Sequence, residues 1–324
     1  MSIRNFLRLS AQIQMLPILE SGEETLVGGQ AVMEGVMMRA PHSYCVAVRK
    51  PNGEIVTDES PLARVSEKYP IFRYPLLRGL GTLGQAMGLG FKALRFSADT
   101  ALAEFQGPEG KSGKAPKQMP PWLLWINLAF SVVFFLVLYK VIPLYLAMQL
   151  VHGRLAVNVA DGLIRLGFLV VFLALISRMK DMHRVFEYHG AEHKVVFNYE
   201  SGKPVNVENA QKFVTWHPRC GTSFLIVVML ISLAAYAFLP IDGYLPRLIV
   251  RIAMLPVIVG ISYEVIRFAA KRQSSLLNFL TTPGLWLQRI TTQPPTDDQA
   301  AVAICALEGA MALEAKQGGE LVIA

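Results

Sequence analysis

The residues best suited to chemistry lie in a short polar stretch between two apolar segments, where residues 187–194 read EYHGAEHK. On a helix, His189 and His193 lie one turn apart on the same face, so both imidazoles can reach one metal ion. Glu192 follows His189 by three residues, near enough to take a proton from a water molecule held there. The order H-x-x-E-H is the inverted form of the zinc-protease helix motif. We therefore expect a site for zinc or another divalent metal.

An alternative explanation of this stretch stays open. Gly190 lies inside the motif and weakens a regular helix by about 1 kcal/mol relative to alanine. A polar helix at the membrane surface can also place its histidines against lipid headgroups without binding a metal. The helix and the metal are both predictions at this point.

A second polar stretch, TWHPRCGTS at residues 215–223, precedes the next apolar segment. His217 and Cys220 have the two-residue spacer found in zinc knuckles and in turns. With the two histidines of the first stretch they would complete a four-ligand site. A metal site with four protein ligands is structural, whereas a site with three protein ligands and a water molecule is catalytic. Only the catalytic form gives the glutamate of the motif a role in the chemistry. Without a metal, the stretch is a helix-capping turn with a buried cysteine.

Three further charged residues are candidates to reach this site. Arg219 could stabilise a developing oxyanion. Glu264 lies in an apolar segment, where a carboxylate is costly and needs a partner. It could be a third metal ligand, although an ion pair with Arg267 or Arg165 is favoured. Glu34 stands alone among apolar residues and either contacts the site or is a solvent-facing strand residue.

The composition favours a membrane protein, because 53% of the residues are hydrophobic and only 17% are charged. Soluble domains usually carry about 25% charged residues. Four apolar segments are expected to be transmembrane helices. They comprise residues 122–139, 155–177, 224–239 and 245–270. The predicted fold is therefore mainly α: a polytopic membrane helical bundle of about four spans, with a small α+β amino-terminal region in the cytoplasm.

The chain is expected to divide into six segments: an amino-terminal region (1–107), a linker (108–121), spans one and two (122–177), a polar loop (178–223), spans three and four (224–270) and a carboxy-terminal tail (271–324). In the first, Pro51-Asn52-Gly53 predicts a β-hairpin. Residues 69–104 predict a glycine-rich helix that lies on this hairpin or on the membrane. Residues 296–316 predict a soluble helix in the tail.

The positions of lysine and arginine predict the orientation. They gather in the linker, in the polar loop and after the fourth span. The positive-inside rule then places both termini and the polar loop in the cytoplasm. Residues 1–20 show no cleavable signal peptide, so we expect the first membrane helix to direct insertion. Three scattered cysteines do not form a disulfide framework, which suits a reducing compartment.

Four blocks of sequence carry a resemblance to a known family. They are GGQAVMEGVMMR at 28–39, EYHGAEHK at 187–194, HPRCGTSF at 217–224 and PTDDQAAVAICALE at 295–308. They resemble the signature blocks of the YqhQ-like family of uncharacterised bacterial membrane proteins, described as predicted metal-dependent enzymes. The resemblance covers about residues 25–310 and implies a multi-pass protein of the bacterial inner (plasma) membrane. It draws attention to Glu34, His189, Glu192, His193, His217, Arg219 and Cys220.

The first functional hypothesis is a metal-dependent hydrolase, such as a peptidase, with its site at the cytoplasmic membrane surface. It is preferred because H-x-x-E-H places a carboxylate where a structural site needs none. The alternative is a membrane scaffold or assembly factor with a structural zinc site that recruits a protein partner. A transporter or channel is disfavoured, because four spans show no internal repeat, although a homo-oligomer could form a pore. Nucleic-acid binding is not expected, because the basic residues form no recognisable motif.

Overall fold

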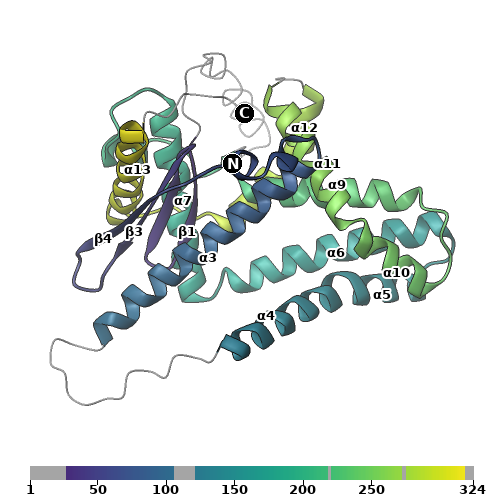
Figure 1. Ribbon diagram of the computed structural model, residues 1–324. Helices are drawn as coiled ribbons and strands as arrows, with labels where there is room; N and C mark the ends of the chain where they lie inside the picture. Colours follow the sequence, from purple (N-terminus) through teal and green to yellow (C-terminus); the bar gives the residue numbers. More distant parts are fainter. Residues whose placement is uncertain (1–26, 106–120, 218–219, 272–274, 318–324) are drawn as a thin grey trace.

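A computed structural model of the chain describes residues 27–105, 121–217, 220–271 and 275–317. It is mainly helical, with a small sheet near the amino-terminal end (Figure 1). The strands are β1 (Gly28–Val32), β2 (Gly35–Arg39), β3 (Ser43–Arg49) and β4 (Ile55–Pro61). The longer helices are α3 (Leu77–Phe105), α4 (Pro121–Leu136), α5 (Ile142–Leu150), α6 (Arg154–Ile176), α7 (Lys180–Glu200), α9 (Gly221–Ala237), α10 (Tyr244–Ala253), α11 (Leu255–Lys271), α12 (Ser275–Thr291) and α13 (Asp297–Gln317). Shorter turns are α2 (Val65–Lys68), η2 (Pro70–Arg73), η3 (Val137–Val141) and α8 (Val207–Gln211).

The four strands form an antiparallel meander in the order β1-β2-β3-β4. Residues 51–53 lie in the turn between β3 and β4, where Gly53 has a φ of 90° that favours glycine. Glu34 lies in the tighter turn between β1 and β2, also with positive φ. Among the described residues β1 pairs with β2 alone, which makes it an edge strand of this sheet. Its second edge has no strand partner in this part of the chain.

The two faces of the sheet are covered by different helices (Figure 1). On one face, alternate side chains of β2 and β3 pack against buried residues of α7 and α13. On the other face, the intervening side chains pack against Leu89 and Ala93 of α3. The glycine-rich helix predicted over residues 69–104 thus lies on the sheet, beginning at Leu77 after the turn η2.

Two described helical stretches are long and apolar enough to cross a membrane, Ala129–Leu150 and Arg154–Ile176. A third results if Tyr244–Ala253 and Leu255–Phe268, which are bent by 48°, are counted as one span. Gly221–Ala237 is apolar but shorter. The predicted four spans are therefore not confirmed: the described helices supply two, or three with the bent pair.

The differences have simple physical causes. The helix predicted to end at Tyr139 continues, because η3 carries the chain into α5 and Pro143 lies in the first turn of that helix. Proline is tolerated there, since the first N–H groups of a helix lack intrahelical partners. α9 has 17 residues and so rises about 25 Å, less than the roughly 30 Å of a hydrocarbon core.

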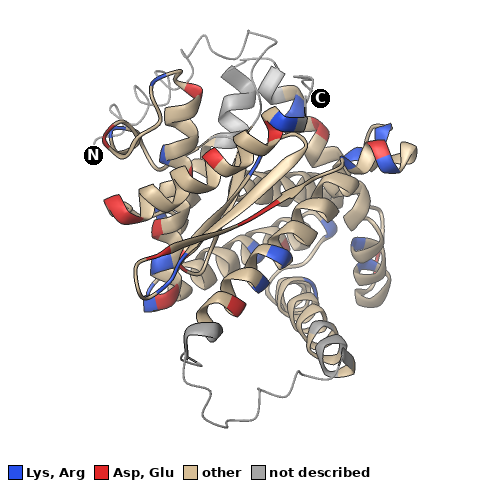
Figure 2. Cartoon of the chain, turned by 60° about the vertical axis from the view of Figure 1, so that its left-hand side comes forward, with Lys and Arg blue, Asp and Glu red and all other residues tan. Residues whose placement is uncertain are grey.

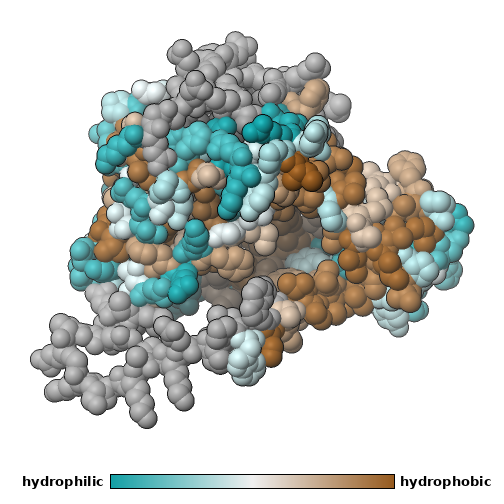
Figure 3. Space-filling model, in the orientation of Figure 1, coloured by the Kyte–Doolittle hydropathy of each residue, from teal (hydrophilic) through white to brown (hydrophobic). Residues whose placement is uncertain are grey.

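The exposed surface of these helices is apolar. Phe130, Val133, Leu163 and Leu175 are each more than half exposed. In Figure 3 hydrophobic residues form a band between the polar region over the sheet and a polar tip at the far right. Figure 2 shows long helical stretches that carry no charged residue. A continuous apolar surface of this kind suits contact with lipid better than contact with water.

A buried ion cluster ties these helices together. Asp161 accepts a hydrogen bond from Nε of Arg165 at 3.2 Å, so the two charges neutralise one another. Arg251 of α10 donates a second one to Asp161 at 2.5 Å and another to Asn158. All four side chains are at most 5% exposed. A lone buried charge is costly, so each of these charged side chains needs a partner. Because the partners lie on different helices, the network links α6 to α10.

Helix α7 is packed so closely that glycine is required at one position. A Cβ on Gly190 would lie 2.0 Å from the carbonyl oxygen of Gln293, in the connection between α12 and α13. The N–H of Gln293 donates a hydrogen bond to the carbonyl of Phe186, one turn earlier in α7. The glycine that weakens the helix in isolation therefore allows the carboxy-terminal connection to dock on it.

We predict that Gly190→Ala lowers thermal stability although alanine is the better helix former. Relieving an approach this close to a backbone carbonyl should cost up to about 3 kcal/mol, which outweighs the gain of about 1 kcal/mol in helix propensity. Gly84→Ala in α3 is the matched control, because its new Cβ meets nothing within 4 Å. We expect this control to gain about 0.5–1 kcal/mol. The measurement is the thermal unfolding midpoint of wild type and both variants in the same detergent. An unchanged midpoint for Gly190→Ala would contradict the close approach of Gln293 to α7.

Candidate metal centre

Helix α7 presents both histidines of the motif on one face, with ring centroids 4.4 Å apart. Nδ1 of His189 lies 2.7 Å from the carbonyl oxygen of Thr291, and Nδ1 of His193 contacts that of Thr215. A carbonyl oxygen only accepts hydrogen bonds, so each Nδ1 carries the proton and each Nε2 keeps its lone pair. Histidines that bind metals are usually oriented in this way.

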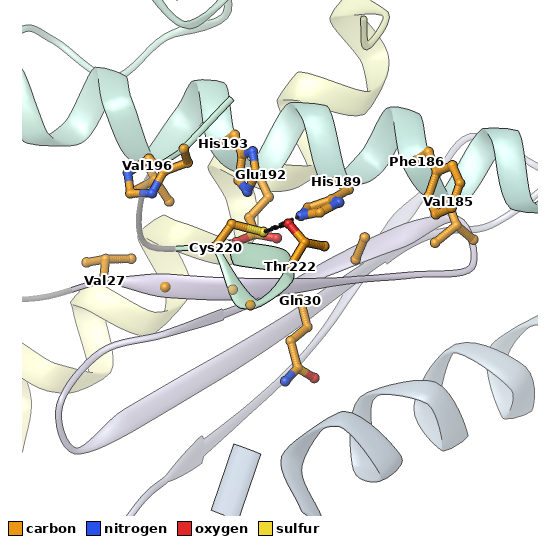
Figure 4. Close-up of a pocket in the computed structure, with 15 residues that line it drawn as sticks. Val27, Gln30, Val185, Phe186, His189, Glu192, His193, Val196, Cys220 and Thr222 are labelled. Atoms are coloured by element: carbon orange, nitrogen blue, oxygen red, sulfur yellow. Dashed lines mark hydrogen bonds between the residues drawn. The ribbon is translucent and has the colours of Figure 1, made fainter. Parts of the chain in front are cut away.

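Cys220 joins the two histidines from the start of α9 (Figure 4). Its Sγ lies 3.3 Å from Nε2 of His189. One donor atom each from His189, His193 and Cys220 lie within 4.8 Å of one another. In a tetrahedral zinc site, bonds of about 2.0–2.1 Å to nitrogen and 2.3 Å to sulfur place such ligands about 3.5 Å apart. The three residues could therefore hold one divalent metal ion.

The position of Cys220 depends on a fully buried glutamine of α12. Gln288 accepts a hydrogen bond from the N–H of His217 at 2.7 Å and donates one to its carbonyl oxygen at 2.8 Å. It also donates to Oγ of Ser223 in the first turn of α9. Gln288 thus holds the backbone of His217 on one side of the cysteine and the side chain of Ser223 on the other. The side chain of Gln288 therefore orients the site but does not line its cavity.

Glu192 extends from α7 toward β1. Its side chain is 6% exposed and accepts a hydrogen bond from the backbone of Gly29. No other residue fits at that strand position, because a Cβ would lie 2.6 Å from the carbonyl of Met37 and 2.9 Å from the Glu192 carboxyl carbon. Burial raises the pKa of Glu192 to about 7. The carboxyl group can therefore gain or lose a proton near neutral pH.

These side chains line one cavity of about 500 Å³. In Figure 4 it lies between α7, the beginning of β1 and the beginning of α9. Residues 27–31 form its strand wall, and Gly221 and Thr222 form its wall from α9. The donors of the candidate metal centre thus open onto a space that a small molecule or an extended chain could enter.

Burial also sets the protonation of the other groups. It lowers the pKa of His193 and of His217 to about 4, so both rings are neutral at neutral pH. For Cys220, burial alone would raise the pKa, but its interactions with His193 and Thr222 outweigh burial and leave the pKa below its ordinary value. Neutral imidazole and thiolate are the forms that bind metals.

The structure does not bring His217 into this group. Its Nε2 lies 3.4 Å from the carboxylate of Glu200, and its ring lies 4.5 Å from that of Phe197. The ring centroid is 5.6 Å from that of His193. Three of the four residues predicted as ligands therefore converge, and His217 lies beside them.

Two predicted carboxylates have other partners. Glu264 pairs with Arg78 of α3 at 2.6 Å, rather than with Arg267 or Arg165, and it is no part of the converging group. Glu34 receives a hydrogen bond from Arg184 at 2.6 Å and so ties the β1–β2 turn to α7 without lining the cavity. Both pairings join segments more than a hundred residues apart, which no local spacing indicates. Arg219, the predicted oxyanion partner, lies outside the described residues.

Several residues that shape the site were missed by the sequence analysis. The carbonyl groups of Thr215 and Thr291 carry no signal in their residue type, because every residue has a carbonyl. Gln288 lies in a helix that the analysis did not predict. Gly29 offered a signal, since paired glycines in a strand often mark a close backbone approach.

We predict that iodoacetamide modifies Cys220 before the other two cysteines in chelator-treated protein at neutral pH. Burial raises the pKa of Cys45 to about 12 and also raises that of Cys305, whereas the pKa of Cys220 is lowered. Since the thiolate is the reactive form, Cys220 should react first. Mass spectrometry of timed digests measures the order. Cys305 is the internal control, because both are partly exposed, and its faster labelling would contradict the prediction.

Comparisons with known proteins identify the family of the chain. Residues 74–313 match the family described as "Protein of unknown function (DUF1385)". The "Uncharacterized protein YqhQ" of Bacillus subtilis (strain 168) is 34% identical over 297 residues, covering 89% of this chain and 93% of that protein. No solved structure matches the chain. The chain therefore belongs to the DUF1385 family, and the resemblance to YqhQ-like proteins is confirmed.

Proposed function

We propose that this protein is a metal-dependent hydrolase at a membrane surface, with zinc or another divalent metal held by His189, His193 and Cys220. The observation that best supports this is the convergence of three donor atoms, within 4.8 Å of one another, on the wall of a cavity of about 500 Å³. Catalytic zinc sites commonly have three protein ligands and one open position, whereas structural sites have four. The arrangement favours catalysis over a purely structural role.

The residues would divide the chemistry among them. A divalent metal, when bound, supplies Lewis acidity and lowers the pKa of water to about 7. His189 and His193 keep Nε2 directed at the common point through their Nδ1 hydrogen bonds. Glu192 takes a proton from water at its carboxylate and returns it to the leaving group. Its position against Gly29 places it in the same cavity.

The shape of the cavity suits an extended peptide as substrate. One wall is the beginning of β1, an edge strand whose outer side has no partner among the strands that the structure describes. Edge strands bind extended peptides through main-chain hydrogen bonds. The glycines at positions 28 and 29 keep side chains out of this approach. A peptidase is therefore the form of hydrolase that we favour.

The membrane arrangement that goes with this function has four passes. α4 with α5, α6, and α10 with α11 are three of them, and the shorter α9 is the fourth. Both termini and α7 then lie on the cytoplasmic side, as the distribution of lysine and arginine favours. Cys220, directly before α9, is placed at the cytoplasmic surface of the bilayer.

We predict that purified protein contains close to one equivalent of a transition metal, and that His189→Ala, His193→Ala and Cys220→Ala each lose most of it. Each change removes one of three ligands, and none of the remaining described residues replaces it in the converging group. His183→Ala on the same helix is the matched control and should keep the metal, because its exposed ring pairs with Glu187. Metal analysis by mass spectrometry gives the count. Metal loss in His217→Ala would instead indicate a closed set of four.

We predict that Glu192→Gln keeps the metal and lowers peptide hydrolysis by about 100-fold or more, as expected for a lost general base. A library of fluorogenic peptides, tested with zinc-loaded protein in detergent, gives the rates. Loss of the metal together with activity, or no change in either, means that the role given to Glu192 is wrong. A different result would support the scaffold with a structural zinc site. In that case wild type binds metal but cleaves none of the peptides, and Cys220→Ser lowers thermal stability.

A further inference from the structure

A second cavity, of about 490 Å³, lies on the other side of β1. Its walls come from the end of β2, the start of α3 and the end of α11, and it shares Val27 and Gly28 with the candidate metal centre. The cavity is lined by 15 residues, of which five are arginines and none is acidic. These arginines are Arg39, Arg64, Arg73, Arg78 and Arg267. We call this cavity the arginine pocket.

Three of the arginines have partners in the protein. Arg78 forms an ion pair with Glu264, in which Nε lies 2.6 Å from the carboxylate. Arg64 lies 3.9 Å from the carboxylate of Glu67. Arg73 donates a hydrogen bond from Nε to a backbone carbonyl at 3.1 Å. Two carboxylates near the pocket are therefore already engaged by two of its five cations.

Arg39 and Arg267 are different. Within the part of the chain that the structure describes, neither donates a hydrogen bond or forms an ion pair with a carboxylate. Both are only partly exposed, and burial followed by the nearby charge of Arg64 lowers the pKa of Arg39. Arginine stays protonated in proteins, so it cannot relieve this repulsion by losing its proton. The cations would be stabilised by an anion that enters from outside.

The chemistry of the lining points to a phosphate group. Planar guanidinium groups bind phosphate through two parallel hydrogen bonds, and several of them are typical of phosphate sites. Ser66 and Thr82 add hydroxyl groups to the same wall. Tyr69, Ile71 and Tyr74 around the turn η2 are each more than half exposed, as expected of a surface that lies in a membrane interface. The phosphate could thus come from a lipid headgroup or from a soluble molecule.

We propose that the arginine pocket is a binding site for a phosphate-bearing anion, held chiefly by Arg39 and Arg267. It lies beside the candidate metal centre but does not depend on a metal there, so it stands or falls separately from the proposed hydrolase. Arg78 has the further task of holding Glu264, which links α3 to α11 next to the pocket. The site would fill by binding alone, without any covalent step.

The test uses full-length protein in detergent and inorganic pyrophosphate as the soluble probe, with isothermal titration calorimetry as the measurement. A second arm uses vesicles of phosphatidylcholine with and without phosphatidic acid, and measures co-sedimentation of the protein. The variants are Arg39→Gln and Arg267→Gln. Lys92→Gln in α3 is the control, because Lys92 is an exposed cation that does not line the pocket.

Each variant should bind the preferred probe about tenfold more weakly or worse, as expected for the loss of one charge-assisted contact, while Lys92→Gln binds as wild type does. Binding of pyrophosphate identifies a soluble phosphate compound, and a response only to phosphatidic acid identifies a lipid headgroup. If Arg39→Gln does not fold, Arg267→Gln decides. The proposal is overturned if wild type binds neither probe, or if the control weakens binding as much as the variants do.

Discussion

Two backbone carbonyl groups determine which atoms of the histidine pair face the cavity. The carbonyls of Thr215 and Thr291 accept from Nδ1 of His193 and His189, so the lone pairs of both Nε2 atoms are left to face the same space. Neither carbonyl belongs to α7. One comes from the segment before α9 and the other from the end of α12, so the donor set exists only when these segments are docked on α7. Tertiary packing, rather than the motif alone, produces the site.

The docking of these segments on α7 and β1 depends on close contacts at glycine positions, where a side chain would not fit. Gly190 admits the carbonyl of Gln293 against α7, and Gly29 admits the side chain of Glu192 against β1. Gly284 of α12 approaches Ser223 of α9 in the same way, with a Cβ position 2.6 Å from its Cα. Each glycine costs conformational entropy on folding. The three glycines lie at the places where α7, β1 and the α9–α12 pair meet, so each of them permits a close approach between these elements.

Local signals in the sequence predicted part of the site. Spacing along α7 predicts that His189 and His193 share a face, and the two-residue spacer drew attention to Cys220; the structure brings these three together. A distant partner carries no such signal, as for Glu264, whose arginine is 186 residues away. The four predicted spans are not confirmed, because hydropathy measures how apolar a segment is and not whether its helix is straight or long enough. The bend between α10 and α11 and the short α9 have no signal in composition.

The first residues of β1 separate two cavities of opposite character. Alternation along β2 places Arg39 on the same face as Met37, which packs toward α3, while Met38 packs toward α7. Arg39 is therefore on the far face of the sheet from the histidines and Cys220, and the other four arginines line the same cavity as Arg39. This separation matters because arginine cations within a few ångströms would oppose a metal cation in a medium of low dielectric constant. With one strand between them, a cation site and an anion site can lie next to each other, and a molecule that carries both a scissile bond and a phosphate could reach both.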